Sequence, residues 1–349
     1  MDQPFLFGES IDTRYEIYST LQKRRDEYNT TALGFRVNLG FELPPFVYFT
    51  SFGTSWNLEN LKVLYQESYL KDIFLRIIQD RNTDLDDDQQ DSLATDLANR
   101  ISKSTQSDNT LLSFNFGANK TDDFGFPTKG YKLNLVLENA NFLQFAYSEM
   151  VNTQLNAPLY YKVQIDFALF PSLFYSKEDA FGIKVRVGNI HVYDGFETSV
   201  PYNQRFTSGG SNSVRGWQSR ELVPEFEIGE LDINSISPAD LEAIVLDQAT
   251  PGGLFQFEGS FETRNRIIGN IGGALFLDYG NTWNNSKSFR FDEIAVSVGF
   301  GLRYYTDFIP FRIDFGIKLY DPDPNSLPIG DRSFWNDLLQ IHFAIGEAF

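Results

Sequence analysis

The sequence contains no cysteine and only two histidines in 349 residues. Without cysteine, the chain can form neither a disulfide framework nor a thiolate metal site. It also lacks any apolar run of the roughly 18 residues that a transmembrane helix requires, and its mean hydropathy is negative. If this chain spans a membrane, it must therefore do so with strands.

Basic residues are scarce as well. The chain has 29 Lys and Arg against 47 Asp and Glu, which gives a formal net charge of −18. Binding of nucleic-acid phosphates requires clustered Lys and Arg. The composition therefore argues against a nucleic-acid partner.

Aromatic residues are abundant, with 34 Phe and 17 Tyr, and such residues favour strands. Apolar and polar residues alternate with a period of two in segments of about ten residues, the length that a tilted membrane strand needs. Within residues 130–141, Leu133, Leu135 and Leu137 fall on one face, whereas Lys132 falls on the other.

This alternation predicts twelve strands, over residues 13–26, 31–42, 46–58, 110–120, 130–141, 160–170, 181–188, 254–264, 270–280, 293–305, 311–319 and 339–349. Their connections are alternately short, as at 264–270, and long, as at 192–254. Short turns at one rim and long loops at the other are typical of outer-membrane barrels, whereas a soluble sandwich does not need ten-residue strands. We therefore predict an all-β fold, an antiparallel transmembrane β-barrel over residues 1–349.

Short helices are expected in two of the long loops. Ser237 and Pro238 have the pattern of a helix start before Leu241, and residues 61–80 are apolar enough for a second helix. The acidic run over residues 84–91 is typical of a hydrated loop. Because its spacing matches no EF-hand loop, a calcium site is the weaker alternative.

The connection 192–254 carries the most specific motif of the chain, Gly-Gly-Ser-Asn-Ser-Val-Arg-Gly-Trp. Its candidate functional residues are Gly209, Gly210, Ser213, Val214, Arg215, Gly216 and Trp217.

The two predicted strands that follow this loop offer carboxylates for its arginine. Strand parity turns Glu258, Glu262 and Asp278 inwards. A buried unpaired charge costs several kcal/mol, whereas a bidentate carboxylate compensates for it. We predict that Arg215 pairs with Glu262 and Asp278 and holds the loop, about residues 193–253, in the lumen. The alternative is a solvated loop arginine beside a merely hydrated acidic wall.

These segments resemble the BamA/TamA superfamily of outer-membrane assembly factors, also called bacterial surface antigens. The sixth extracellular loop of that family carries a Gly-Gly-x-x-Ser-Val/Ile-Arg-Gly-aromatic motif and folds back into the barrel, where its Arg meets wall carboxylates. The stretches around Glu262 and Asp278 look like the family's partner strands. The resemblance implies location in the bacterial outer membrane.

The resemblance also implies a function, the insertion or translocation of other outer-membrane proteins. A seam between the first and last strands opens, and substrate strands pair with the exposed edges. The implied partners are outer-membrane lipids, unfolded outer-membrane proteins, and accessory lipoproteins or an inner-membrane partner. The alternative is a passive channel or a two-partner-type secretion pore, because relatives that export single proteins carry the same motif.

The carboxyl end resembles the assembly signal of outer-membrane barrels, with alternating apolar residues before a terminal aromatic. Its residues are Phe343, Ile345, Gly346 and Phe349. Because Phe349 shares the outward parity of Phe343 and Ile345, we expect it at the membrane interface.

Members of that family have sixteen strands, preceded by periplasmic polypeptide-transport-associated domains. The motifs align the first predicted strand here with the family's fifth. Residues 1–10 lack an export signal. We therefore expect a barrel that is incomplete at its amino end, with no periplasmic domains in this sequence.

The two histidines argue against catalysis. By parity, His191 points outwards near a rim, and His342 points inwards beside Ala344 and Gly346. No convergent acid, base and nucleophile can be assembled around either of them. The sequence therefore predicts no enzymatic activity, no metal and no cofactor.

Overall fold

The computed structural model describes residues 2–4, 11–24, 27–43, 47–79, 86–100, 103–153, 157–173, 178–195, 197–224, 252–306, 309–323 and 326–349. In this part of the chain, one antiparallel sheet of thirteen strands runs in sequence order from β1 to β13. The strands are β1 (Asp2–Pro4), β2 (Ile11–Lys23), β3 (Tyr28–Glu42), β4 (Ser51–Tyr65), β5 (Ser104–Asn119), β6 (Gly130–Ala140), β7 (Leu159–Phe170), β8 (Asp179–Asp194), β9 (Phe255–Ile268), β10 (Ile271–Trp283), β11 (Ala295–Tyr304), β12 (Phe311–Tyr320) and β13 (Leu339–Ile345).

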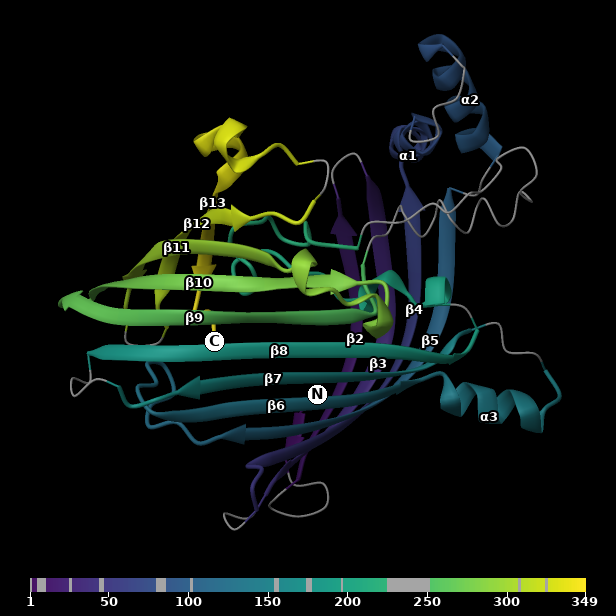
Figure 1. Cartoon of the computed structure of the whole chain (residues 1–349). Coiled ribbons are helices and arrows are strands. Elements are labelled where there is room, and N and C mark those ends of the chain that lie inside the picture. Colours follow the sequence, from purple (N-terminus) through teal and green to yellow (C-terminus); the bar gives the residue numbers. More distant parts are fainter. Residues whose placement is uncertain are drawn as a thin grey trace.

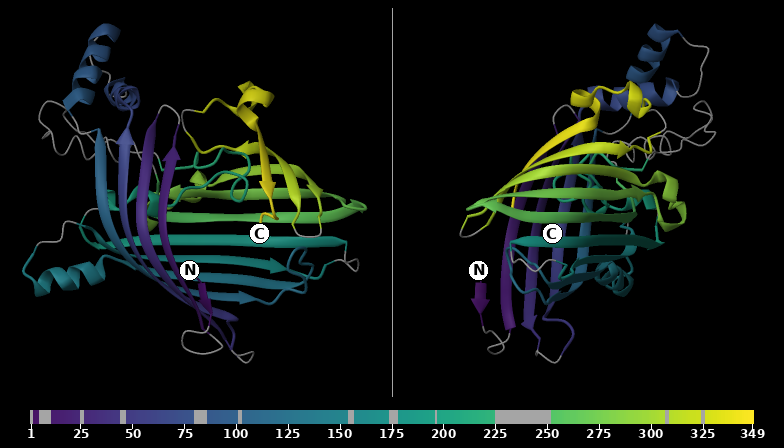
Figure 2. Two further views of the ribbon diagram at one scale, coloured as in Figure 1. Left: turned by 180° about the vertical axis from the view of Figure 1, so that it is seen from behind. Right: turned by 60° about the vertical axis from the view of Figure 1, so that its left-hand side comes forward.

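This topology confirms the all-β antiparallel prediction, because each of the twelve predicted strands corresponds to one of β2–β13. The short strand β1, which pairs with β2, was not predicted. The sheet is strongly curved, and β2–β5 cross steeply behind β6–β10 (Figure 1). Two further views show residues 197–224, from the connection between β8 and β9, lying on the concave side (Figure 2).

The alternation along the strands sorts side chains between the two faces of this curved sheet. Large apolar side chains on the convex face are exposed, among them Leu275, Phe300 and Ile341. The concave face of the same strands carries buried polar and charged residues, as Glu262 and Asp314 illustrate. An apolar outer face around a polar interior is the arrangement of a membrane barrel.

Three α-helices occupy long connections: α1 (Glu67–Gln79), α2 (Asp87–Arg100) and α3 (Phe142–Met150). None of the helices in the described part of the chain is long and apolar enough to cross a membrane. The predicted helix at Leu241 lies outside the described residues. The acidic run is partly within α2, and the described residues contain no cluster of acidic residues or histidines suited to a metal ion.

The predicted helix over 61–80 was wrong at its start, because β4 continues to Tyr65 and α1 begins only at Glu67. The physical reason is a shared core. Leu61, Val63 and Tyr65 keep the strand alternation and are buried against helix residues. That core is made of Tyr28, Leu61, Val63, Tyr65, Leu70, Ile73, Phe74, Ile77, Ile78, Ala94, Leu97, Ala98 and Tyr202.

Candidate functional site

The site is built on the concave face of β9–β13. Alternate residues of these strands point towards residues 197–224, which belong to the connection between β8 and β9. Strand register places Ser260 opposite Asp278 and Glu262 opposite Phe276. On the next strand pairs, Asp278 lies opposite Ser297 and Asp314 lies opposite His342. Carboxylates from neighbouring strands therefore converge on one patch of the inner wall.

The loop residues 197–224 reach this wall through a compact turn. Gly209 and Gly210 have φ values of +99° and +101°, a region that favours glycine. The backbone N–H of Gly210 donates to the carbonyl of Trp217 at 3.0 Å, which closes the turn around Arg215. Val214 and Trp217 are buried in a small cluster with Leu222 and Ala295. The apolar residues of the motif therefore support the charged one.

Arg215 is 1% exposed and forms a bidentate pair with Asp278, in which Nε and Nη2 each lie 2.8 Å from a carboxylate oxygen. Its Nη1 lies 2.6 Å from Glu262 Oε2. The backbone N–H of Arg215 also donates to Asp278 Oδ2 at 3.1 Å. The guanidinium carbon lies 3.4 Å from the ring centroid of Phe276. The structure thus brings together Arg215, which the loop motif selected, and Glu262 and Asp278, which strand parity selected.

A larger ion network surrounds this trio. Asp314 Oδ1 accepts from Arg303 Nη1 at 2.6 Å, and Asp314 Oδ2 accepts from Arg312. Asp314 also lies 3.7 Å from Arg215 Nη1. Arg264 Nε lies 2.7 Å from Glu262 Oε1. Buried charges of this kind require such partners, because each one alone would be strongly destabilising.

The sequence analysis did not select Arg264, Arg303, Arg312, Asp314 or Glu347. Strand parity could have indicated that Arg303, Arg312 and Asp314 point inwards, because they alternate with outward apolar residues. Glu347 joins the network after the end of β13, with Oε2 at 3.2 Å from Arg303 Nε. Four arginines and four carboxylates thus share this interior: Arg215, Arg264, Arg303 and Arg312 with Glu262, Asp278, Asp314 and Glu347.

Ser213 attaches the loop to a second carboxylate on β9. Its hydroxyl hydrogen-bonds to Glu258, and Ser208 donates to the same carboxylate oxygen at 3.0 Å. Glu258 is also paired with Arg186 at 2.8 Å. In addition, Lys184 Nζ donates to the carbonyl of Asn212 at 2.5 Å. These contacts hold the loop residues that precede Arg215 to β8 and β9.

The loop backbone lies very close to two strands. Gly216 donates its N–H to Ser297 Oγ at 3.2 Å, and His342 Nε2 lies 3.0 Å from the carbonyl oxygen of Arg215. A Cβ atom added at Gly316 would lie 2.1 Å from that same carbonyl oxygen. Glycine at position 316 therefore makes room for the loop.

Replacing Gly316 with alanine is expected to destabilise the protein by about 1–3 kcal/mol, because the new methyl group displaces the Arg215 carbonyl. The measurement is the urea midpoint of unfolding in detergent. Gly273→Ala on β10 is the matched control, since its Cβ would meet no atom closer than 3.4 Å, on Ile267. Equal midpoints for the two variants would contradict close packing of the loop on β12.

The loop has a second attachment, on the opposite wall of the sheet. Tyr202 hydrogen-bonds through its hydroxyl to Gln22 Oε1 at 3.0 Å and to Thr30 Oγ1 at 3.3 Å. Asn203 donates to Glu59 Oε1 at 2.7 Å. The same loop therefore contacts β2–β4 through Tyr202 and Asn203. It contacts β9–β13 through Arg215 and the residues next to it.

The carboxyl end differs from the prediction. β13 ends at Ile345, and Gly346 has a φ of +85°, so the chain bends after the strand. Phe343 and Ile345 are exposed on the convex face as predicted by parity. Phe349, however, stacks on Phe170 with ring centroids 5.9 Å apart and lies beneath Arg264, so the expected interfacial position of Phe349 is wrong.

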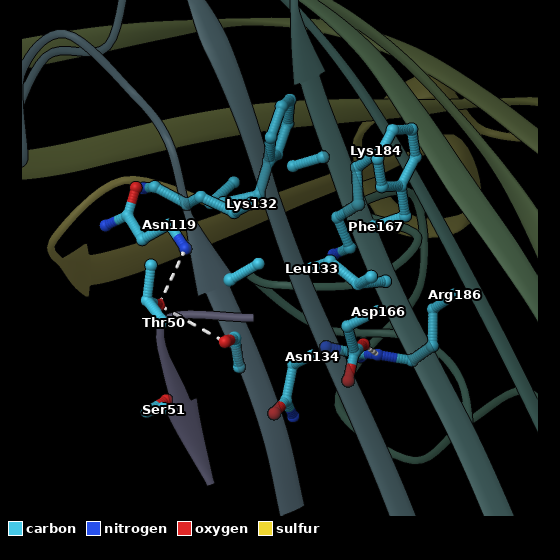
Figure 3. Close-up of a pocket in the computed structure, with 15 residues that line it drawn as sticks. Thr50, Ser51, Asn119, Lys132, Leu133, Asn134, Asp166, Phe167, Lys184 and Arg186 are labelled. Carbon is cyan, nitrogen blue, oxygen red and sulfur yellow. Dashed lines mark hydrogen bonds and ion pairs between the residues drawn. The ribbon is translucent and has the colours of Figure 1, made fainter. Parts of the chain in front are cut away.

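Phe349 and Ala348 instead border an interior cavity of about 370 Å³, which residues of β4–β8 complete. Figure 3 shows Lys132, Asp166, Lys184 and Arg186 around this cavity, with Asp166 and Arg186 in an ion pair. The bend at Gly346 breaks the strand parity on which the expectation for Phe349 rested.

The two histidines lie on opposite faces of the curved sheet. His342 faces the Arg215 carbonyl, and His191 is exposed and packs against Tyr161 in a tilted arrangement with ring centroids 5.1 Å apart. The inward and outward directions agree with strand parity. Both contacts are explained by packing and hydrogen bonding.

Comparison with known protein families decides the family. The model of the Omp85 superfamily domain matches residues 2–349. The chain belongs to the Omp85 superfamily. This membership confirms the resemblance drawn from the loop motif, and it places this Omp85 chain in the outer membrane of a Gram-negative type of cell.

A solved structure of a BamA protein shows the same fold. BamA from Haemophilus ducreyi lacking POTRA domains 1–3 is 16% identical, with a TM-score of 0.63 over 99% of this chain and 60% of that chain. CdiB from Acinetobacter baumannii is 13% identical with a TM-score of 0.48, over 96% of this chain and 47% of that one. CdiB from Escherichia coli is 13% identical with a TM-score of 0.44, over 96% and 48%. The Omp85 chain described here therefore spans between about half and three-fifths of the length of these proteins.

Proposed function

We propose that this Omp85 chain is the barrel portion of a factor that inserts or translocates other outer-membrane proteins, in the manner of BamA or TamA. The observation that carries the proposal is the buried contact of Arg215 with Asp278 and Glu262. It fixes a long loop to the inner wall of β9–β13 and links β9 to β10 there through one guanidinium. A wall held together in this way beside β13, the last strand in the described sheet order, suits a barrel that works by strand exchange.

The edge strand β13 is the proposed working edge. It lies at one end of the sheet order and pairs with β12 over only seven residues, Leu339–Ile345. The backbone groups of an edge strand template the pairing of an incoming strand. Its convex side chains Phe343 and Ile345 present an apolar surface to lipid. A substrate strand added here would gain main-chain hydrogen bonds and lipid-facing packing together.

This mechanism needs no bond cleavage, metal or cofactor, because the free energy comes from strand pairing and from burial of apolar side chains in lipid. The proposed partners are outer-membrane lipids and unfolded outer-membrane proteins. Accessory lipoproteins or an inner-membrane partner are proposed to assist. Arg215, Glu262 and Asp278 act in this scheme by positioning the wall, not by chemistry.

Depletion of the protein from its own cell tests the proposal. We expect several unrelated outer-membrane β-barrel proteins to fall together, measured by quantitative proteomics of the outer membrane. Complementation by the gene carrying Arg215→Ala should fail, whereas Arg290→Ala, which alters an exposed loop pair with Asp292, should restore their levels.

Loss of one secreted protein alone would instead favour a dedicated secretion pore. Steady ion conductance of the purified protein in a planar bilayer, with normal levels of other barrels after depletion, would favour a passive channel. Either result would overturn the assembly proposal.

A further inference from the structure

Helix α3, between β6 and β7, presents its apolar half to the outside. Phe142, Leu143, Ala146, Tyr147, Met150 and Val151 fall within one half of its helical circumference. Met150 is 82% exposed and Tyr147 is 65% exposed. The opposite half carries Gln144, Phe145, Ser148 and Glu149, of which Ser148 is only 6% exposed and Glu149 is exposed.

This orientation is the reverse of that of a water-exposed surface helix, which buries its apolar stripe and exposes its polar side. An exposed apolar patch of this kind marks a site of interaction with another protein, a ligand or a membrane. Helix α1 of the same protein follows the usual rule, since Leu70, Ile73 and Phe74 are buried in the shared core. The two helices therefore face different surroundings.

The start of α3 is firmly held. Asn141, fully buried and with a φ of +62°, accepts from the backbone N–H of Thr110 at 2.8 Å through its side-chain oxygen. Its amide nitrogen donates to the carbonyl of Pro158 at 2.8 Å, and its own N–H donates to the carbonyl of Thr110 at 2.7 Å. These bonds tie the helix to β5 and to the start of β7. The direction in which α3 leaves the sheet is thus set by the fold.

The helix begins at the end of the lipid-facing rows of β6–β8. The outward row that contains Leu133, Leu135 and Leu137 ends at Asn139, three residues before Phe142. Asn139 lies opposite Tyr161, which lies opposite His191. Tyr193 is exposed and receives a hydrogen bond from Asn139 at 3.2 Å. Tyrosines at the end of apolar rows mark the level of the membrane interface.

Figure 1 shows α3 projecting from the end of β6 away from the concave side that holds the loop, while α1 and α2 lie at another part of the rim. Because Phe142 follows the end of the outward row of β6 after three residues, the exposed apolar residues of α3 begin next to the lipid-facing surface of the sheet. Phe142–Met150 contains no Lys or Arg and only one acid, Glu149. A segment so poor in charge fits the apolar side of a lipid interface better than the surface of a charged partner.

We propose that α3 lies in the outer leaflet of the membrane as an interfacial helix, with Tyr147 and Met150 inserted among lipid chains. Interfacial helices insert their apolar side by about 5–10 Å. The helix would extend the lipid contact of the barrel sideways at β6–β7, far along the sheet from β13. The proposal rests on the outer-membrane location alone and does not require the Arg215 contacts or the assembly function.

The absence of cysteine from the chain makes a direct test possible. Met150→Cys and the matched control Glu149→Cys would each carry one environment-sensitive fluorophore. The probe membrane is phosphatidylcholine vesicles containing phosphatidylcholine with a nitroxide near the carbonyl end of its chain. Asp88→Cys on α2 provides a label in water, and heat-modifiable mobility on gels verifies that each variant is folded.

We expect the label at position 150 to emit at shorter wavelength and to be quenched by the lipid nitroxide several-fold more than the label at position 149. The label at position 88 should respond only to aqueous iodide. Equal access of iodide to positions 150 and 88 would overturn the proposal. Protection of position 150 that disappears on dilution of protein in the membrane would also overturn it, because a second copy would then cover the helix.

Discussion

Replacing Arg215 with alanine is expected to lower the free energy of unfolding by about 3–5 kcal/mol, because it leaves the buried carboxylate of Asp278 without its counter-charge. Asp278 loses a bidentate partner and Glu262 loses a contact at 2.6 Å. The measurement is urea-induced unfolding of the detergent-solubilised protein, followed by tryptophan fluorescence. Released from the wall, the loop should also become sensitive to protease.

Two variants serve as controls for this result. Arg290→Ala removes an ion pair whose arginine side chain is 63% exposed, and should cost only about 0–1 kcal/mol. Arg215→Lys keeps the charge but loses the planar fork, so it should recover only part of the loss. If Arg215→Ala unfolds at the same urea concentration as Arg290→Ala, the loop arginine does not hold the loop to the wall.

The second large effect is expected at Asp314, where replacement by asparagine leaves three arginines without a shared carboxylate. Arg303 and Arg312 each hydrogen-bond to Asp314, and Arg215 lies 3.7 Å away. We expect Asp314→Asn to destabilise the protein by about 3–5 kcal/mol, as for a broken buried ion pair. The same urea titration measures it.

A double variant separates charge from packing at this position. If the loss arises from unpaired arginines, adding Arg312→Gln to Asp314→Asn should restore part of the stability, since contacting residues are not additive. Losses that simply add in the double variant would contradict the charge explanation. A restored double variant would show that the interior network tolerates removal of charges in pairs.

The fold and the central ion trio could be predicted because both depend on a short-range signal. Period-two alternation sets the strands, and the same parity turns Glu262 and Asp278 towards the interior. The loop motif then identified Arg215 as the group that they meet. Each inference needed only neighbouring residues and one specific motif.

The rest of the network was harder to select, because parity alone does not say which inward charges meet. Arg303 and Asp314 lie on the neighbouring strands β11 and β12, but they are not directly opposite each other, because Asp314 lies opposite Gly301. Their hydrogen bond therefore depends on the exact strand register. Glu347 lies beyond the last strand and joins the network only because the chain bends at Gly346. The same bend carries Phe349 from its expected outward position into the interior.

Helix α3 escaped prediction for a related reason. The alternation of β6 ends at Ala140, and the helix follows after a single residue, Asn141, in a left-handed conformation. Nine residues give fewer than three helical turns, which is too few for a clear helical period. Its apolar half also faces outwards, so it gives no signal of a buried core.

Residues 197–224, in the loop between β8 and β9, bridge the interior of the curved sheet. Tyr202 and Asn203 form hydrogen bonds at one end, and Arg215 forms ion pairs at the other. Moving β2–β4 away from β9–β13 must break one of these two attachments. The attachment at Tyr202 and Asn203 is the weaker, because it consists of single hydrogen bonds, whereas Arg215 forms a bidentate ion pair with Asp278. Residues 197–224 would therefore move with β9–β13, and such a separation would open the interior on the side of β2–β4.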